Sequence, residues 1–296
     1  MVARRLTRRQ VLRAAGGALL PVSLLGGSLG GEAVLVPPAA LFPVERRQFA
    51  FSRGPDRPLR TVVWSPVAPG PFPLVLFSHG LHGSPERFAQ MIADIAGAGF
   101  VVAAPAYPNT MAGTAAFDAG DMPNQPADAA AVITAVLAGE LAGRVLPDRI
   151  GAVGHSAGGY TTAGLLAGRS RDTRVRTAVV LAGGAMNGAF TGPATEVLFV
   201  QGDRDPIVPY AAGRAAYQDV PWPKAFLTLA GADHESWMFD RSRAAVVTTR
   251  TVLGFLRAFL HADPSARTRL DTDGALPGVA RLEAECLQRG CAPEPF

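Results

Sequence analysis

The feature that most constrains this sequence is the pattern Gly154-His155-Ser156-Ala157-Gly158, which stands between an apolar run and a run of small residues. Residues 150–154 are typical of a short buried strand and residues 157–166 of a helix, so the serine is expected on the tight turn between them. The flanking glycines leave room for a backbone approach that a Cβ would block. This turn would expose the Ser156 hydroxyl beside the unpaired N–H of Ala157. The five residues alone also fit a glycine-rich turn that has no catalytic role. The assignment therefore depends on whether an acid and a histidine are placed to act with the serine.

Apolar strands and helices alternate along the chain. Strands are expected at residues 47–52, 59–65, 74–78, 100–104, 150–154, 178–182, 197–201 and 225–229. Helices are expected at residues 85–96, 126–137, 157–166, 211–217 and 241–260, the first with Ser84 as its N-cap and Pro85 at its first position. Continuous apolar strands separated by helices predict an α/β fold, with a mostly parallel central sheet covered by helices on both faces. Without an internal repeat or a low-complexity linker, residues 34–296 are predicted to form a single domain with a C-terminal tail at 263–296.

Two further chemical groups follow later strands. Asp205 comes shortly after the strand at 197–201, and His234 comes shortly after the strand at 225–229. Ligands gather at the carboxyl ends of parallel strands, so these side chains are expected near Ser156. Asp203 competes with Asp205 for the acidic role, and the Asp-Pro pair favours Asp205 because it places that residue in the loop. Serine, aspartate and histidine then occur in the chain order of a serine hydrolase triad.

The chain resembles the serine esterases of the α/β-hydrolase superfamily over about residues 47–260. It is most similar to the branch of dienelactone-hydrolase-like, platelet-activating-factor-acetylhydrolase-like and cutinase-like polyester hydrolases. The resemblance rests on Phe77-Ser78-His79-Gly80-Leu81, Gly154-His155-Ser156-Ala157-Gly158, Asp205-Pro206-Ile207-Val208-Pro209 and Asp233-His234. It implies a carboxylic-ester hydrolase that works through an acyl-enzyme, with Ser156 as nucleophile, His234 as general base and Asp205 as the residue that orients the histidine. The backbone N–H groups of Leu81 and Ala157 would form the oxyanion hole.

The substrate side of the site is less determined. Only residues 183–196 separate the strand ending near Ala182 from the next strand, which is too short for a large cap domain. Tyr107, Met186 and Trp237 follow strand ends and are predicted to contact the substrate, although ordinary core packing would explain them equally well. We expect a small-molecule or polymeric ester as the substrate.

The N-terminus predicts export. Residues 7–13, Thr-Arg-Arg-Gln-Val-Leu-Arg, resemble the twin-arginine export motif, and a weak apolar run interrupted by Pro21 and by glycines follows. This run is too broken for a stable membrane span, so residues 1–33 are predicted to be a removed signal peptide. The alternative is an uncleaved amphipathic anchor. Export would place the protein in the cell envelope, the periplasm or the medium.

The sequence contains two cysteines, both near its C-terminal end. The two are Cys286 and Cys291, and in an exported protein they are expected to form a disulfide.

Five of the 28 basic residues and one of the 24 acidic residues lie in residues 1–33. The remainder is therefore balanced at 23 of each and gives no support for a nucleic-acid partner. No ligand cluster, P-loop or dinucleotide pattern is present, so neither a metal nor a cofactor is expected, and we expect a monomer.

Two other functions remain compatible with these residues. An acyltransferase would form the same acyl-enzyme and differ only in the attacking alcohol. A non-catalytic binding protein can use the same fold, but such scaffolds usually lack one triad residue, and all three are present here.

Overall fold

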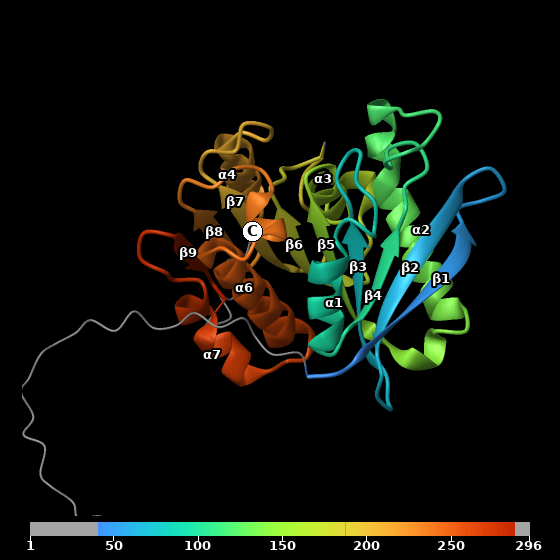
Figure 1. Ribbon diagram of the computed structural model, residues 1–296, viewed down its shortest axis with the longest axis horizontal. Helices are drawn as coiled ribbons and strands as arrows, with labels where there is room; N and C mark the ends of the chain where they lie inside the picture. The colour runs from blue at the N-terminus through green and yellow to red at the C-terminus, as the bar shows by residue number, and fades with distance from the viewer. Residues whose placement is uncertain (1–40, 187, 288–296) are drawn as a thin grey trace, which may run out of the picture. The chain divides into compact units, whose positions relative to one another are not determined.

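The computed structural model describes residues 41–186 and 188–287. Contacts divide the chain into Met1–Val34, which lies outside the described residues, and Leu35–Phe296, the unit treated below. The described residues form a sheet in the order β1-β2-β4-β3-β5-β6-β7-β8-β9 (Figure 1). Its strands are β1 (Val44–Ser52), β2 (Pro58–Pro66), β3 (Phe72–Ser78), β4 (Val101–Pro105), β5 (Val145–His155), β6 (Val175–Leu181), β7 (Glu196–Gly202), β8 (Lys224–Leu229) and β9 (Ala280–Glu285).

The centre of the sheet is parallel, and its two sides are antiparallel. Neighbouring strands from β4 through β3, β5, β6 and β7 to β8 all run in the same direction. The β1–β2 hairpin joins β4 antiparallel on one side, and β9 joins β8 antiparallel on the other. The central strands are buried on both faces, which explains their continuous apolar sequences.

Helices cover both faces of the sheet. They are α1 (Ala89–Gly97), α2 (Gln125–Ala138), α3 (Ala157–Gly164), α4 (Tyr210–Asp219), α5 (Ser236–Phe239), α6 (Arg243–Leu260) and α7 (Pro264–Asp273), with short 3₁₀ turns η1 (Ala119–Asn124), η2 (Ala142–Arg144) and η3 (Gly168–Ser170). Residues of α1, α6 and α7 belong to one apolar cluster, and residues of α2, α3 and α4 belong to another. The mostly parallel sheet with helices on both faces confirms the predicted α/β-hydrolase architecture.

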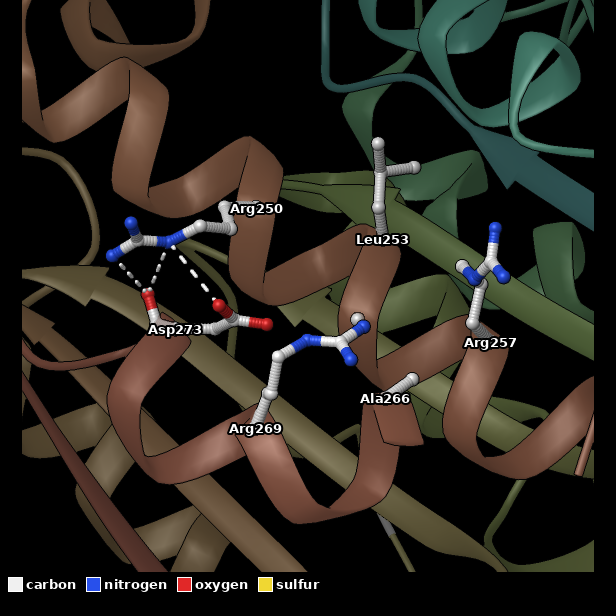
Figure 2. A pocket seen from close by; sticks show the side chains of 7 residues that line it. Arg250, Leu253, Arg257, Ala266, Arg269 and Asp273 are labelled. Carbon is white, nitrogen blue, oxygen red and sulfur yellow. Dashed lines mark hydrogen bonds and ion pairs between the residues drawn. The ribbon is translucent and has the colours of Figure 1, made fainter. Parts of the chain in front are cut away.

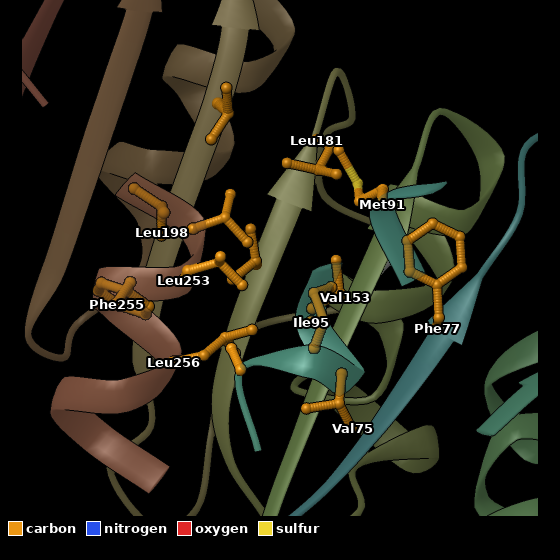
Figure 3. Packing of buried hydrophobic residues seen from close by; sticks show 14 of the residues in the cluster. Val75, Phe77, Met91, Ile95, Val153, Leu181, Leu198, Leu253, Phe255 and Leu256 are labelled. Carbon is orange, nitrogen blue, oxygen red and sulfur yellow. The ribbon is translucent and has the colours of Figure 1, made fainter. Parts of the chain in front are cut away.

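The alternation of side chains along β3 shows how the two cores are separated. Val75 and Phe77 pack with α1 and α6, whereas Leu74 and Leu76 pack on the opposite face with α2. Figure 3 shows the first core, where Val75, Phe77 and Ile95 gather on one side and side chains of α6 approach from the other. Each fully buried aliphatic side chain contributes about 1.5–3 kcal/mol of burial free energy. These two cores hold the strand ends that carry the candidate site.

The structure departs from the sequence-based elements in two places. Helix α1 begins at Ala89 rather than at residue 85, and its N-cap is Phe88 rather than Ser84. The described part of the predicted tail forms α7 and β9, and β9 pairs with β8 along its whole length. Between β6 and β7 the described residues of 182–195 contain no helix, as expected for a hydrolase without a large cap.

Candidate active site

Ser156 lies on a strained turn between β5 and α3. Its backbone has φ +56° and ψ −121°, a conformation that L residues rarely adopt and that costs on the order of 1–3 kcal/mol. The turn is held by the Ser156 N–H, which donates to Leu181 O at 2.9 Å, and by the start of α3, where Tyr160 N donates to Ser156 O at 3.0 Å. The side chain is partly exposed, whereas the residues on either side are buried. The turn therefore presents a hydroxyl at the carboxyl end of the central strand.

The glycines of the pattern are required by close backbone contacts. A Cβ on Gly158 would lie 2.0 Å from Ser78 O, and one on Gly154 would lie 2.0 Å from Gly158 O. A Cβ on Gly80, in the loop after β3, would lie 3.1 Å from the Cβ of Ser156. The loop after β3 is thus packed directly against the serine turn.

Asp205 lies in the loop after β7, and three donors hold its carboxylate. Its Oδ1 accepts hydrogen bonds from the N–H groups of Ile207 at 2.8 Å and Val208 at 2.9 Å. Its Oδ2 lies 2.7 Å from Nδ1 of His234, and its side chain is fully buried. Asp203, the competing candidate, is exposed and accepts from Gly231 N at 2.7 Å instead. The geometry favours Asp205 as the partner of the histidine.

His234 is fixed at both its side chain and its backbone. Because the Asp205 carboxylate can only accept, Nδ1 of His234 donates, and a neutral ring then keeps Nε2 free to accept a proton. His155, the residue before the serine, donates from Nε2 to His234 O at 3.1 Å, and the two rings lie 4.7 Å apart. Burial lowers the pKa of His155 to about 3, so its ring stays neutral. Asp233 accepts from Ser236 N at 2.8 Å, which holds the next turn.

His79 fixes the peptide that carries the predicted oxyanion donor. Tyr107 N donates to His79 Nε2 at 3.1 Å, so Nδ1 carries the proton and donates to Gly80 O at 2.8 Å. Gly83 N donates to the same carbonyl at 3.0 Å. Since C=O and N–H are antiparallel in a trans peptide, both contacts also fix the direction of the Leu81 N–H. In the described part of the chain, no hydrogen bond joins the N–H of Leu81 or of Ala157 to another residue. Both donors are thus available to a ligand.

Two of the three predicted substrate contacts lie in the core. Tyr107 is fully buried, and its hydroxyl lies 2.7 Å from Ser78 Oγ. Trp237 is 1% exposed, and its Nε1 donates to Asp233 O at 3.0 Å. Their positions after strand ends are as expected, and their side chains turn inward, which favours core packing over substrate contact for both residues. Met186 is partly exposed and packs near Gly164 of α3, and it remains a candidate.

A cavity of about 370 Å³ lies elsewhere, between α6 and α7, and is lined by Arg250, Leu253, Gly254, Arg257, Ala266, Arg269 and Asp273 (Figure 2). None of the predicted catalytic residues contributes to it. Arg250 donates from Nε to Asp273 O at 3.0 Å, which is the last carbonyl of α7. Its guanidinium thus ties α7 to α6 and has a structural role.

The described residues contain neither a metal-binding cluster nor a membrane-spanning helix. No group of three or more His, Cys, Asp or Glu side chains is placed to hold a metal ion. No helix in this part of the chain is both long and apolar enough to cross a bilayer.

Comparison with known proteins gives one family. A sequence profile of the chlorophyllase family matches residues 38–191, more than half of the chain, while no individual curated protein matches. The matched segment runs from before β1 to beyond β6 and includes Ser156, Leu81 and Ala157. Asp205 and His234 follow it, so their assignment depends on geometry. The match supports the superfamily without selecting the dienelactone-hydrolase-like, acetylhydrolase-like or cutinase-like branch. The chain belongs to the chlorophyllase family, whose members are esterase-type hydrolases of the α/β-hydrolase superfamily.

Proposed function

We propose that this protein is a serine hydrolase that cleaves carboxylic esters through an acyl-enzyme. The observation that carries the proposal is the 2.7 Å contact between His234 Nδ1 and the fully buried Asp205 Oδ2. These two residues lie in separate loops at the same end of the sheet as the Ser156 turn. A buried carboxylate bonded to Nδ1 holds the tautomer that a general base requires.

The proposed reaction has two stages, acylation of Ser156 and hydrolysis of the acyl-enzyme. His234 Nε2 takes the proton of Ser156 as Oγ attacks the ester carbonyl, and the N–H groups of Leu81 and Ala157 stabilise the oxyanion. The alcohol leaves with the proton from His234, and Ser156 remains acylated. Water then attacks the acyl-enzyme with the same base, which releases the acid and restores the serine. Attack by an alcohol instead of water would give acyl transfer.

The family name directs the choice of substrate. Chlorophyll, the compound to which the family name refers, is therefore the natural ester that we propose as a substrate. We propose esters of this kind, together with small activated esters, as the substrates.

Hydrolysis of p-nitrophenyl acetate, p-nitrophenyl butyrate and chlorophyll by the wild type and by Ser156→Ala tests the proposal. The variant should lose about 10⁴-fold or more in kcat with an unchanged thermal unfolding midpoint. Ser265→Ala, on α7, is the matched control and should retain full activity. Residual activity of Ser156→Ala within tenfold of the wild type would exclude the mechanism, and a parallel assay with an alcohol acceptor separates hydrolysis from acyl transfer.

We also propose that the protein is exported by the twin-arginine route and acts outside the cytoplasm. The support is the Arg8-Arg9 pair and the weak apolar run after it; residues 1–33 lie outside the described part. The double variant Arg8→Lys with Arg9→Lys should keep the enzyme in the cytoplasm, whereas the wild type should appear outside with an N-terminus near residues 31–41. Full export of the double variant would contradict this route.

The proposed disulfide belongs to the same exported state. Cys286 follows β9, and Cys291 lies outside the described residues. The intact mass of the exported protein should rise by two hydrogens on reduction.

A further inference from the structure

Three buried polar side chains, those of Thr161, Gln125 and Thr110, form a chain that links helix α3, which follows Ser156, to the loop after β4. Gln125, the first residue of α2, is fully buried and donates from Nε2 to Thr110 Oγ1 at 2.7 Å. Its Oε1 accepts from the hydroxyl of Thr161, on α3, at 2.5 Å. Thr110 and Thr161 are also fully buried. One amide therefore spans two segments that lie 51 positions apart along the sequence, and it uses its donor on one and its acceptor on the other.

The Thr110 end of this chain holds the predicted oxyanion loop. Thr110 O accepts from His82 N at 2.9 Å, and Gly83 O accepts from Ala112 N at 2.9 Å. The ring of His82 also stacks on Phe117, with centroids 3.7 Å apart. His82 has φ +53°, so its left-handed backbone depends on neighbours to hold it. Leu81, whose N–H is the proposed oxyanion donor, is the residue immediately before it.

A buried polar chain of this kind is sensitive to the loss of one member. Inside the protein a hydrogen bond is strong, and an unpaired buried group is costly, so the segments move to restore pairing. Thr161 has a second acceptor, because its hydroxyl also lies 2.9 Å from Ala157 O. Among the described contacts, Gln125 Nε2 is the one donor to Thr110 Oγ1, so this oxygen has no replacement partner when the amide is lost. Loss of the Gln125 amide would therefore act on the Thr110 loop and leave α3 in place.

We propose that Gln125 is a positioning residue, which aligns the Leu81 N–H with the substrate oxyanion through Thr110 and His82. The inference rests on the proposed esterase function and goes beyond it, because Gln125 contacts no reacting atom. The three side chains link the two segments that carry the proposed oxyanion donors. The Thr161 hydroxyl contacts the carbonyl of Ala157 on α3, and Thr110 O accepts from the N–H of His82, the residue after Leu81. An oxyanion donor stabilises the transition state more than the ground state, so a misplaced donor lowers kcat and leaves KM nearly unchanged.

Steady-state kinetics of Gln125→Met tests the proposal, because methionine keeps the shape of glutamine and removes both hydrogen bonds. We expect kcat for p-nitrophenyl butyrate to fall about tenfold or more, with KM within twofold of the wild type. Binding of a trifluoromethyl ketone, whose adduct with Ser156 carries an oxyanion, should weaken by the same factor as kcat. Thr251→Val is the matched control: it removes a buried hydroxyl on α6 that contacts Val247 O and Asp273 O, and it should destabilise the fold without changing kcat.

A second pair of variants keeps the test decisive if Gln125→Met fails to fold. Thr110→Val removes the acceptor and should lower kcat as Gln125→Met does, while Thr110→Ser keeps the hydroxyl and should restore it. The double variant Gln125→Met with Thr110→Val should be no slower than either single variant. Wild-type kcat in both Gln125→Met and Thr110→Val would overturn the proposal while leaving the esterase function standing. A wild type without Ser156-dependent hydrolysis would overturn both.

Discussion

At the scale of single residues, the two acidic side chains after β7 have different partners. Asp205 is buried and bonded to His234, whereas Asp203 is exposed and bonded to the backbone of Gly231. Asp205→Asn would place an amide against Nδ1 and favour the wrong tautomer, so kcat should fall about 10⁴-fold. Asp203→Asn keeps an acceptor for Gly231 N and should stay within threefold of the wild type. The reverse order of damage in an ester assay would show that the acid is misassigned.

Buried histidines make stability depend on pH. Burial lowers the pKa of His79 to about 4 and that of His155 to about 3, against about 6.5 in an unfolded chain. Between pH 6.5 and about 4 the unfolded chain binds protons that the folded chain excludes, so the free energy of unfolding falls as the pH falls. Each histidine contributes a slope that approaches about 1.4 kcal/mol per pH unit.

Urea unfolding at pH 7, 6 and 5 measures this slope. His155→Gln keeps a donor toward His234 O but cannot titrate, so its slope between pH 6 and 5 should be smaller by about one proton. Equal stability of the wild type at pH 7 and pH 5 would contradict the buried neutral state of both rings.

The sequence predicts the candidate triad but not which neighbouring side chains are buried. Ser156, Asp205 and His234 could be proposed from the sequence because each follows an apolar strand and their order is that of a known triad. The buried positions of Tyr107 and Trp237 were not, because the end of a strand does not determine which way the following side chain turns. Gln125 gave no signal, since its partners Thr110 and Thr161 lie 15 and 36 positions away.

At the scale of elements, the contact between the β5–α3 turn and β3 leaves no room for a side chain on Gly158. A Cβ on Gly158 would lie 2.0 Å from Ser78 O and 2.8 Å from His79 O, and backbone atoms cannot rotate away. Gly158→Ala should therefore destabilise the protein by about 2 kcal/mol or more, lower its melting temperature by about 5 °C or more and abolish ester cleavage.

The control is Gly143→Ala in η2, where a Cβ would meet nothing within 4 Å. Its melting temperature and activity should equal those of the wild type. Full activity of Gly158→Ala would mean that the turn does not pack as described.

Strand β9 and the start of helix α1 were not predicted from the sequence. Strand β9 has the sequence Ala-Arg-Leu-Glu-Ala-Glu, which is too polar to predict a buried strand. Its extended conformation is stabilised by backbone pairing with β8 rather than by burial of its own side chains. Helix α1 starts late because residues 85–88 form turns, in which Arg87 N donates to Ser84 O at 3.2 Å. The continuous apolar runs of β3 to β8 were predictable because burial on both faces leaves little choice of residue.

At the scale of the whole molecule, charge and topology agree with the proposed esterase. The balanced charge of residues 34–296 gives no broad field toward a polyanion. The parallel strands from β3 to β8 place the loops that carry Leu81, Ser156, Asp205 and His234 at one end of the sheet, and the family match covers the first two of these. We propose that these loops make Ser156 a nucleophile.

Covalent labelling of Ser156 tests that claim most directly. An organophosphorus ester such as paraoxon should react once per protein molecule, and peptide mapping by mass spectrometry should place the adduct on the peptide containing Ser156. Loss of ester cleavage should follow the extent of labelling, and Ser156→Ala should not be labelled. Labelling at another residue, or full ester cleavage by the completely labelled protein, would contradict the account.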